Sequence, residues 1–83
     1  VVGSHTHVPT ADARIVPKRT AYQTDAGMCG DYQSVIGFKT DAPLERFLSK
    51  INKIRMDPAA GEGRVCGPYV ETDDATGLAT HCE

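Results

Sequence analysis

The sequence predicts a small mixed fold of short strands, one amphipathic helix and a C-terminal hairpin. Apolar residues recur at helical spacing between 44 and 54, and two strand-like arms flank a run of turn-forming residues near the end of the chain. Short extended stretches precede the helix. The 83 residues, 8.9 kDa in mass, are enough for one small domain.

The predicted helix depends on five apolar residues that fall on one face of an α-helix. A proline suits the first turn, where its missing N–H costs little, and an aspartate before it suits the N-terminal cap. Basic residues near the C-terminal end suit the helix dipole and are interpreted as a solvated face. The apolar residues are Leu44, Phe47, Leu48, Ile51 and Ile54; the proline is Pro43 and the cap is Asp41.

Before the helix, the chain is predicted to be extended in short pieces. Residues 14–16 form one such piece, which Pro17 ends, and residues 20–24 alternate apolar and polar side chains as a half-buried strand does. Residues 35–38, with the sequence Val-Ile-Gly-Phe, are expected to be a short buried run.

The C-terminal hairpin is predicted from two strand-like arms at residues 65–71 and 78–82. The connecting residues 72–77 are rich in turn formers, and Gly77 is available for a positive φ. Pro68 lies inside the first arm, which makes this arm an edge or bulged strand because proline has no N–H to donate.

Composition excludes several classes of protein. The chain has 9 basic and 11 acidic residues and a net charge of −2, so it lacks the basic surface of a nonspecific nucleic-acid binder or of a polybasic membrane protein. Only two Phe, three Tyr and no Trp are present, so a self-sufficient core would be thin.

No apolar run approaches the ~18–20 residues of a transmembrane helix, and no signal peptide opens the sequence. We therefore expect no membrane partner, and the missing export signal together with an odd number of cysteines favours the cytoplasm. Because Val1 is not an initiator methionine, the sequence is expected to begin at a processing site, a proteolytic cut or an artificial boundary.

The three cysteines do not form a recognisable metal motif, because CxxC spacing is absent among Cys29, Cys66 and Cys82. Cys66 and Cys82 could lie nearly opposite each other on the hairpin, which leaves a disulfide open. Reduced thiols are the favoured interpretation, since disulfides are rare in the cytosol.

The most informative residues for function are two histidines, His5 and His7, in an extended segment after Gly3. Side chains at positions i and i+2 of an extended backbone point the same way, so the two imidazoles can face one spot. Imidazole is a common ligand of Zn, Mn and Fe. Gly3 would let the chain turn sharply and leave room for a metal. Two exposed loop histidines without a ligand are the alternative.

The segment that contains these histidines, Gly-Ser-His-Thr-His-Val at residues 3–8, resembles the last motif of the calcineurin-like metallophosphoesterases. Further similarity identifies one branch, the YmdB-like phosphodiesterases that act on 2′,3′-cyclic nucleotides. It continues in order through nearly the whole chain, in residues 5–15, 20–22, 24–28, 34–37 and 70–77.

The resemblance implies an α/β fold, a four-layer α/β/β/α sandwich, which as an isolated fragment would be α+β. Members of this family are several times longer, so residues 1–83 correspond to the C-terminal segment of a single metallophosphoesterase domain whose N-terminal part is absent. The other metal ligands of the family, and the catalytic histidine of an Asn-His pair, lie upstream. No catalytic residue is therefore expected within this chain.

The resemblance also implies a hydrolase: a metal-dependent phosphodiesterase or phosphatase. Two Mn, Fe or Zn ions would hold a bridging hydroxide that attacks phosphorus. His5 would bind one ion and His7 the other, and the 83 residues alone would be inactive. The implied partners are a phosphoester or cyclic-nucleotide substrate and the rest of the same enzyme chain; a homo-oligomer stays open, and stable binding of nucleic acid is not expected.

A glycine-containing loop supplies the candidate substrate-binding residues Asp25, Gly27 and Gly30, because such loops let backbone N–H groups approach anions. A structural turn is the alternative interpretation of the same residues. Asp12 and Arg14 are expected to form an ion pair that fixes the neighbouring loop rather than to contact phosphate.

A different class of function is also open: a small stand-alone metal-binding or protein-interaction module without catalytic activity. It would use His5 and His7 with Cys29 or His81 as a site for one metal.

The turn at Lys18-Arg19 departs from the family, which usually has two glycines there, so this turn is expected to differ in shape.

Overall fold

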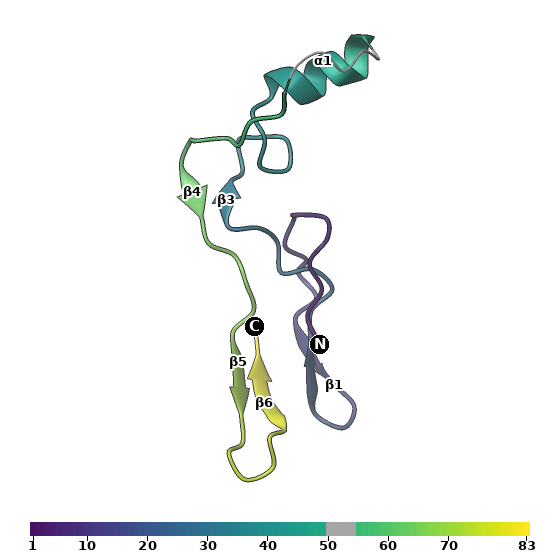
Figure 1. The fold of residues 1–83 in the computed structure, drawn as a ribbon. Coiled ribbons are helices and arrows are strands. Elements are labelled where there is room, and N and C mark those ends of the chain that lie inside the picture. Colours follow the sequence, from purple (N-terminus) through teal and green to yellow (C-terminus); the bar gives the residue numbers. More distant parts are fainter. Residues whose placement is uncertain (50–54) are drawn as a thin grey trace. The chain divides into compact units, whose positions relative to one another are not determined.

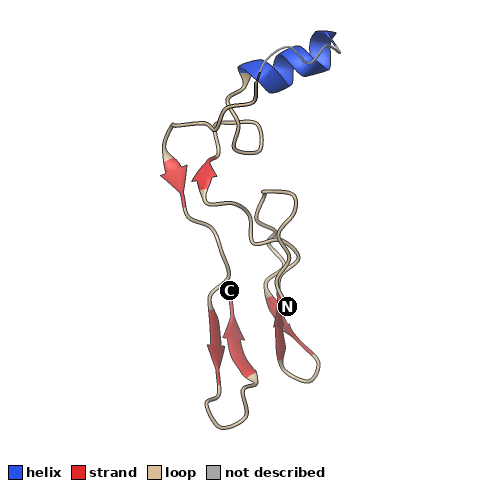
Figure 2. Cartoon of the chain, viewed as in Figure 1, coloured by secondary structure: helices blue, strands red, loops and turns tan. Residues whose placement is uncertain are grey.

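The structure is a computed structural model, and it describes residues 1–49 and 55–83 (Figure 1). Short strands separated by long loops and a single described helix make up the chain, in agreement with the predicted mixed fold (Figure 2). The first of two compact units comprises residues 1–28 and 66–83, and the second comprises residues 29–65. The elements are β1 (Arg14–Val16), β2 (Thr20–Tyr22), β3 (Gly30–Asp31), α1 (Asp41–Ser49), β4 (Gly63–Arg64), β5 (Val70–Thr72) and β6 (Ala79–Cys82).

In the first unit, β1 and β2 form an antiparallel hairpin in which Val16 pairs with Thr20. The predicted extended stretches are thus confirmed, although the second ends at residue 22 instead of 24. Lys18 and Arg19 in the connecting turn have φ values of 69° and 62°, in the left-handed region that glycine adopts without strain. The backbone N–H of Arg19 closes the turn by donating to the carbonyl of Val16 at 3.0 Å.

The N-terminal segment is tied to the chain just after β2. Val2 forms a parallel bridge with Gln23, and the N–H of Gly3 donates to the carbonyl of Gln23 at 3.1 Å. Seven residues beyond Val2, Pro9 forms a bridge with Ala26. Residues 4–8 are therefore a loop that is anchored at both ends to one stretch of backbone.

The C-terminal hairpin of β5 and β6 is confirmed, with Val70 paired to Cys82 and a register shift between Glu71 and Thr72. Gly77 in its turn has the expected positive φ, at 70°. The first arm begins at residue 70 and not at 65, so the predicted start was wrong. Pro68 explains the difference, since it cannot donate to a ladder, and regular pairing starts only after it.

In the second unit, β3 and β4 pair antiparallel, with Gly30 opposite Arg64. The run at residues 35–38 was expected to be buried, and this was wrong: Val35 and Ile36 are 39% and 51% exposed. These residues form a tight turn in which Val35 and Phe38 exchange two backbone hydrogen bonds of 3.0 and 2.9 Å. Such a reversal directs its central side chains outward.

Helix α1 begins one residue away from the predicted cap. The N–H of Leu44 donates to the carbonyl of Thr40 at 3.1 Å, so Thr40 precedes the helix and Asp41 lies in its first turn. There the carboxylate still interacts favourably with the helix dipole. The predicted positions of Ile51 and Ile54 lie outside the described residues.

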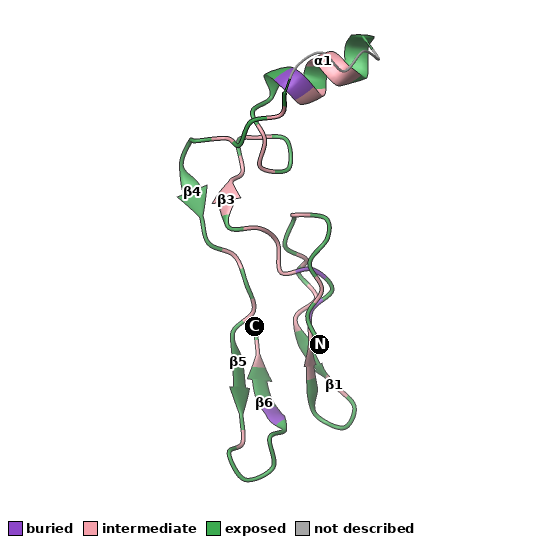
Figure 3. Ribbon diagram, viewed as in Figure 1, coloured by how far each residue is buried: buried purple, intermediate pink, exposed green. Residues whose placement is uncertain are grey.

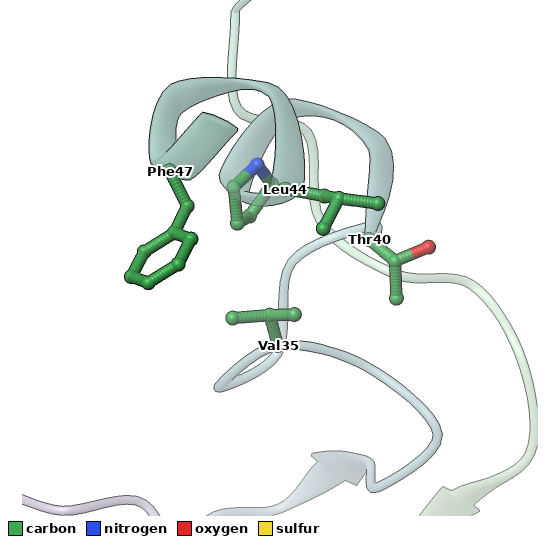
Figure 4. A pocket seen from close by; sticks show the side chains of 5 residues that line it. Val35, Thr40, Leu44 and Phe47 are labelled. Carbon is green, nitrogen blue, oxygen red and sulfur yellow. The ribbon is translucent and has the colours of Figure 1, made fainter. Parts of the chain in front are cut away.

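The apolar face of α1 is largely uncovered. Leu44, Phe47 and Leu48 are 57%, 84% and 74% exposed. An apolar groove of about 460 Å³ runs beside the helix within the second unit (Figure 4). Its lining consists of Val35, Thr40, Pro43, Leu44 and Phe47.

Burial is sparse throughout the part of the chain that the structure describes (Figure 3). Ala42 and Ala79 are its buried apolar residues, and Gln23 and Asp25 are its buried polar residues. The thin core expected from the composition is thus confirmed. Within residues 1–49 and 55–83, no helix combines the length and the apolar character needed to cross a membrane.

Gly3 is in a place where no side chain fits. A Cβ atom on this residue would lie 2.1 Å from the carbonyl oxygen of Thr24, far inside van der Waals contact. The glycine was expected to provide a sharp turn. Its structural role is instead to let two stretches of backbone approach closely.

We predict that the substitution Gly3→Ala destabilises the protein by about 1–3 kcal/mol, the usual cost of forcing extra atoms into a packed site. Urea unfolding of the purified variants measures this effect. Gly67→Ala is the matched control, because a Cβ at Gly67 meets nothing within 4 Å. Equal stability of the two variants would contradict the close approach at Gly3.

Candidate functional site

His5 and His7 lie in the loop of residues 4–8 in the first unit. His5 is exposed and His7 is half-buried. His7 has a φ of 64°, so the segment bends there, and the expectation of an extended backbone with alternating side chains was wrong. A non-glycine residue in this region costs on the order of 1–3 kcal/mol and persists only where its surroundings enforce it.

The surroundings that enforce the bend converge on Asp25, whose exposure is only 2%. Its Oδ2 accepts hydrogen bonds from the backbone N–H groups of His5 at 2.9 Å and Thr6 at 2.6 Å, and from the Thr6 hydroxyl at 2.8 Å. Its Oδ1 accepts one from the N–H of Gly27 at 2.8 Å. These donors, the Thr6 N–H foremost, hold the pKa of the Asp25 carboxyl well below its ordinary value.

The candidate substrate-binding residues Asp25 and Gly27 belong to the first unit, and Gly30 belongs to the second. Both carboxylate oxygens of Asp25 accept hydrogen bonds from residues of the same unit. One of the donors is the N–H of Gly27, which has a φ of 80°. The structural interpretation of these two residues is thus the one that the contacts support. Gly30 lies in β3 of the second unit, where it pairs with Arg64. Contact of Asp25, Gly27 or Gly30 with a substrate stays a prediction.

A second carboxylate, that of Asp12, holds the segment after β2 in which Asp25 lies. Its Oδ1 accepts hydrogen bonds from the Thr10 hydroxyl at 2.6 Å and the Thr24 N–H at 3.1 Å, and its Oδ2 accepts one from the Thr24 hydroxyl. The Thr10 hydroxyl in turn accepts from the N–H of Asp25 at 3.0 Å. The roles of Thr10 and Thr24 were not predicted from the sequence, although Thr10 lies two residues before Asp12 and Thr24 directly before Asp25.

The expected ion pair between Asp12 and Arg14 is confirmed, with Nη1 of Arg14 3.1 Å from Oδ2 of Asp12. The guanidinium also lies over the ring of Tyr22, 4.6 Å from its centroid. Because both charged side chains are partly exposed, this pair contributes little stability by itself and mainly orients the carboxylate.

The donor chemistry of the loop suits a transition-metal ion, since neutral imidazole is a good ligand for Zn, Mn and Fe. Two imidazoles are too few for a complete site. Within residues 1–49 and 55–83, no three His, Cys, Asp or Glu side chains gather into a group that could hold a metal. Completing a site at His5 and His7 therefore requires further ligands.

The residues named in the alternative one-metal site are engaged elsewhere or lie outside the loop's unit. His81 is on β6, with its Nε2 3.5 Å from Oε2 of Glu83 and its ring against that of Tyr69. Cys29 belongs to the second unit. Cys66 and Cys82 are not joined by a disulfide, in line with the favoured interpretation.

We predict that Asp12 makes the protein sensitive to acid. The hydroxyls of Thr10 and then Thr24 lower the pKa of the Asp12 carboxyl, so its stabilising effect is complete above the unfolded pKa of about 3.9. Below that pH the unfolded chain takes up a proton that the folded chain does not, and the stabilising effect declines progressively as the pH falls toward the lowered pKa of the folded state. The stability difference between wild type and D12N should therefore shrink from about pH 6 to about pH 3 in urea unfolding.

Arg14→Met is the control for this pH dependence. Arg14 is the weakest of the groups that lower the Asp12 pKa, so R14M should keep most of the wild-type acid sensitivity. A difference between wild type and D12N that stays constant across this range would show that Asp12 is not anchored by the two threonines.

Comparison with known proteins gives the chain its family. The family model described as YmdB-like protein matches residues 1–83. A curated relative, the 2′,3′-cyclic-nucleotide 2′-phosphodiesterase of Bacillus subtilis (strain 168), is 42% identical over 83 residues, which are 100% of this chain and 31% of that protein.

Two solved structures are also similar. A novel phosphatase from Mycoplasma pneumoniae has a TM-score of 0.90 and 36% identity, with 99% of this chain matched to 29% of that one. A hypothetical protein from Thermus thermophilus has a TM-score of 0.88 and 38% identity, with 99% matched to 31%. The chain thus spans less than a third of the length of these relatives. The resemblance inferred from the motifs is confirmed: the chain belongs to the YmdB-like protein family.

Proposed function

We propose that the chain forms part of a metal-dependent phosphodiesterase that hydrolyses 2′,3′-cyclic nucleotides. The observation that carries this proposal is the loop of His5 and His7, held in a strained conformation within a chain that matches the family from residue 1 to residue 83. The name of the B. subtilis relative supports the substrate class, and the Mycoplasma neighbour supports a phosphoesterase.

The role of this segment is to present two imidazoles to a pair of Mn, Fe or Zn ions, His5 to one ion and His7 to the other. When bound, such ions lower the pKa of water and neutralise charge on phosphate oxygens. The loop supplies these ligands in a conformation that is fixed before binding, so the cost of bending the backbone at His7 is met during folding.

Hydrolysis of the ester bond to O2′ adds water to phosphorus, leaves a 3′-phosphate and requires a proton on the departing O2′. We infer that this proton comes from a histidine outside these 83 residues, as does the remainder of the ligand set. The chain's own contribution is positioning: it orients the two imidazoles and shields the Asp25 carboxylate that holds their loop.

The proposal extends to the fold. The exposed apolar face of α1 and the small number of buried residues support a segment that packs against further polypeptide of the same enzyme. Within that enzyme, residues 1–83 would complete one metallophosphoesterase domain, a four-layer α/β/β/α sandwich. A cytoplasmic location, where disulfides are rare, is part of the same proposal.

We predict that His5→Ala and His7→Ala each weaken metal binding by the full-length protein by more than about 100-fold, since removing a residue that only orients a ligand already costs 10–100-fold. Hydrolysis of 2′,3′-cyclic AMP should fall in parallel. Calorimetry with Mn²⁺ and chromatography of the nucleotide products measure the two effects.

His81→Ala is the matched control, because it removes an exposed histidine of the same unit that contacts Glu83 and Tyr69 instead of the loop. It should bind metal and hydrolyse substrate as the wild type does. Full activity in H5A or H7A would rule out the assigned ligand roles.

We also predict that the isolated 83-residue chain does not hydrolyse 2′,3′-cyclic nucleotides, because two imidazoles cannot hold a pair of metal ions. The measurement is product formation by the purified chain at a concentration far above that needed for the full-length enzyme. Hydrolysis by the isolated chain that disappears in H7A would refute this prediction and require ligands from within the chain or from a second copy.

A further inference from the structure

His7 lies between Thr6, which is bonded to the Asp25 carboxylate, and Val8, which is bonded to the side chain of Thr6. Thr6, before it, binds Asp25 through both its N–H and its hydroxyl, at 2.6 and 2.8 Å. Val8, after it, donates its N–H to the Thr6 hydroxyl oxygen at 3.2 Å. The backbone on each side of the strained residue is therefore fixed with respect to the same carboxylate.

The Thr6 hydroxyl can serve both neighbours because its donor and acceptor capacities are separate. It has one hydrogen, and the carboxylate Oδ2 of Asp25 at 2.8 Å is a nearer and more strongly charged acceptor than the carbonyl of Val8 at 3.2 Å. Its lone pairs remain available for the Val8 N–H. The Thr6 hydroxyl thus links the Asp25 carboxylate on one side of His7 to the backbone N–H of Val8 on the other side.

We propose that Asp25 and Thr6 are positioning residues for the metal site, which hold the imidazole of His7 in ligating orientation by locking its backbone at positive φ. This inference rests on the proposed function, because it assigns His7 a metal. The side chain of Asp25 is buried, and its hydrogen bonds among the described residues come from the loop and from Gly27, so we assign it a role through the histidines and not on the substrate.

The test uses two independent readouts on the full-length protein. In the metal-free state, NMR reports the backbone of residue 7 through its intraresidue NOE between the amide and Hα protons, which is strong when φ is positive. Calorimetry then measures affinity for Mn²⁺ and for Zn²⁺, each added alone. The variants are Asp25→Asn, Thr6→Val, which keeps the shape but loses the hydroxyl, and Thr6→Ser, which restores it.

The chain contains a matched control for both positions. In the turn between β5 and β6, Oδ1 of Asp73 accepts from the N–H and the hydroxyl of Thr76, at 2.9 and 3.1 Å. The Thr76 hydroxyl also accepts from the N–H of Leu78 at 3.3 Å. Asp73→Asn and Thr76→Val therefore break the same kind of bonds in the same unit, away from the histidines.

We expect D25N and T6V to weaken the NOE at residue 7 and to reduce metal affinity about 10–100-fold. T6S, D73N and T76V should retain the wild-type NOE and affinity. An unchanged NOE in D25N and T6V overturns the inference, and so does a weakened NOE with wild-type affinity. Failure of the wild type itself to bind either metal is a different result, which rejects the proposed function and the positioning role together.

Discussion

The buried carboxylate of Asp25 is the constraint on which the first unit depends. None of the apolar side chains in residues 1–9 is buried, so polar bonds take over the task of holding this segment. Four donors from three residues bond to this carboxylate. If the loop moved away, the buried carboxylate would lose those hydrogen bonds, which costs free energy, and this cost favours the native conformation of the loop. Asp12 gives the same kind of support to the segment after β2, directly at Thr24 and through the Thr10 hydroxyl at Asp25.

Elements defined by local patterns were predicted well from the sequence. The extended stretches that became β1 and β2, the C-terminal hairpin, helix α1 and the positive φ of Gly77 all follow from side-chain alternation, apolar periodicity or turn composition. The pairing of β1 with β2 was not predicted. The pairing of His5 and His7 as candidate ligands came from the motif. The conformation of their loop was not predicted, because it depends on a hydrogen bond between the backbone of His5 and the side chain of Asp25, 20 residues away in sequence. Patterns of apolar and polar residues do not indicate such bonds.

The second unit shows the complementary limit of sequence patterns. Residues 35–38 and the stripe on α1 are apolar in the way that buried segments are, yet Val35, Ile36 and Phe47 are exposed. Hydrophobic patterning states that a surface favours burial but does not state which polypeptide covers it. The chain spans less than a third of the length of its relatives. Within the described residues, the apolar face of α1 is not covered by other residues, and the loop of His5 and His7 is not supplied with further metal ligands.

The close approach at Gly3 bears on how such a motif should be interpreted in distant homologues. The glycine that opens Gly-x-His-x-His is required by the backbone of Thr24, whose carbonyl oxygen leaves no room for a Cβ. A homologue that had lost both imidazoles during evolution would still need it to fold. Glycine at this position therefore reports that the local architecture is kept, whereas the two histidines after it report whether the chain still offers imidazole ligands.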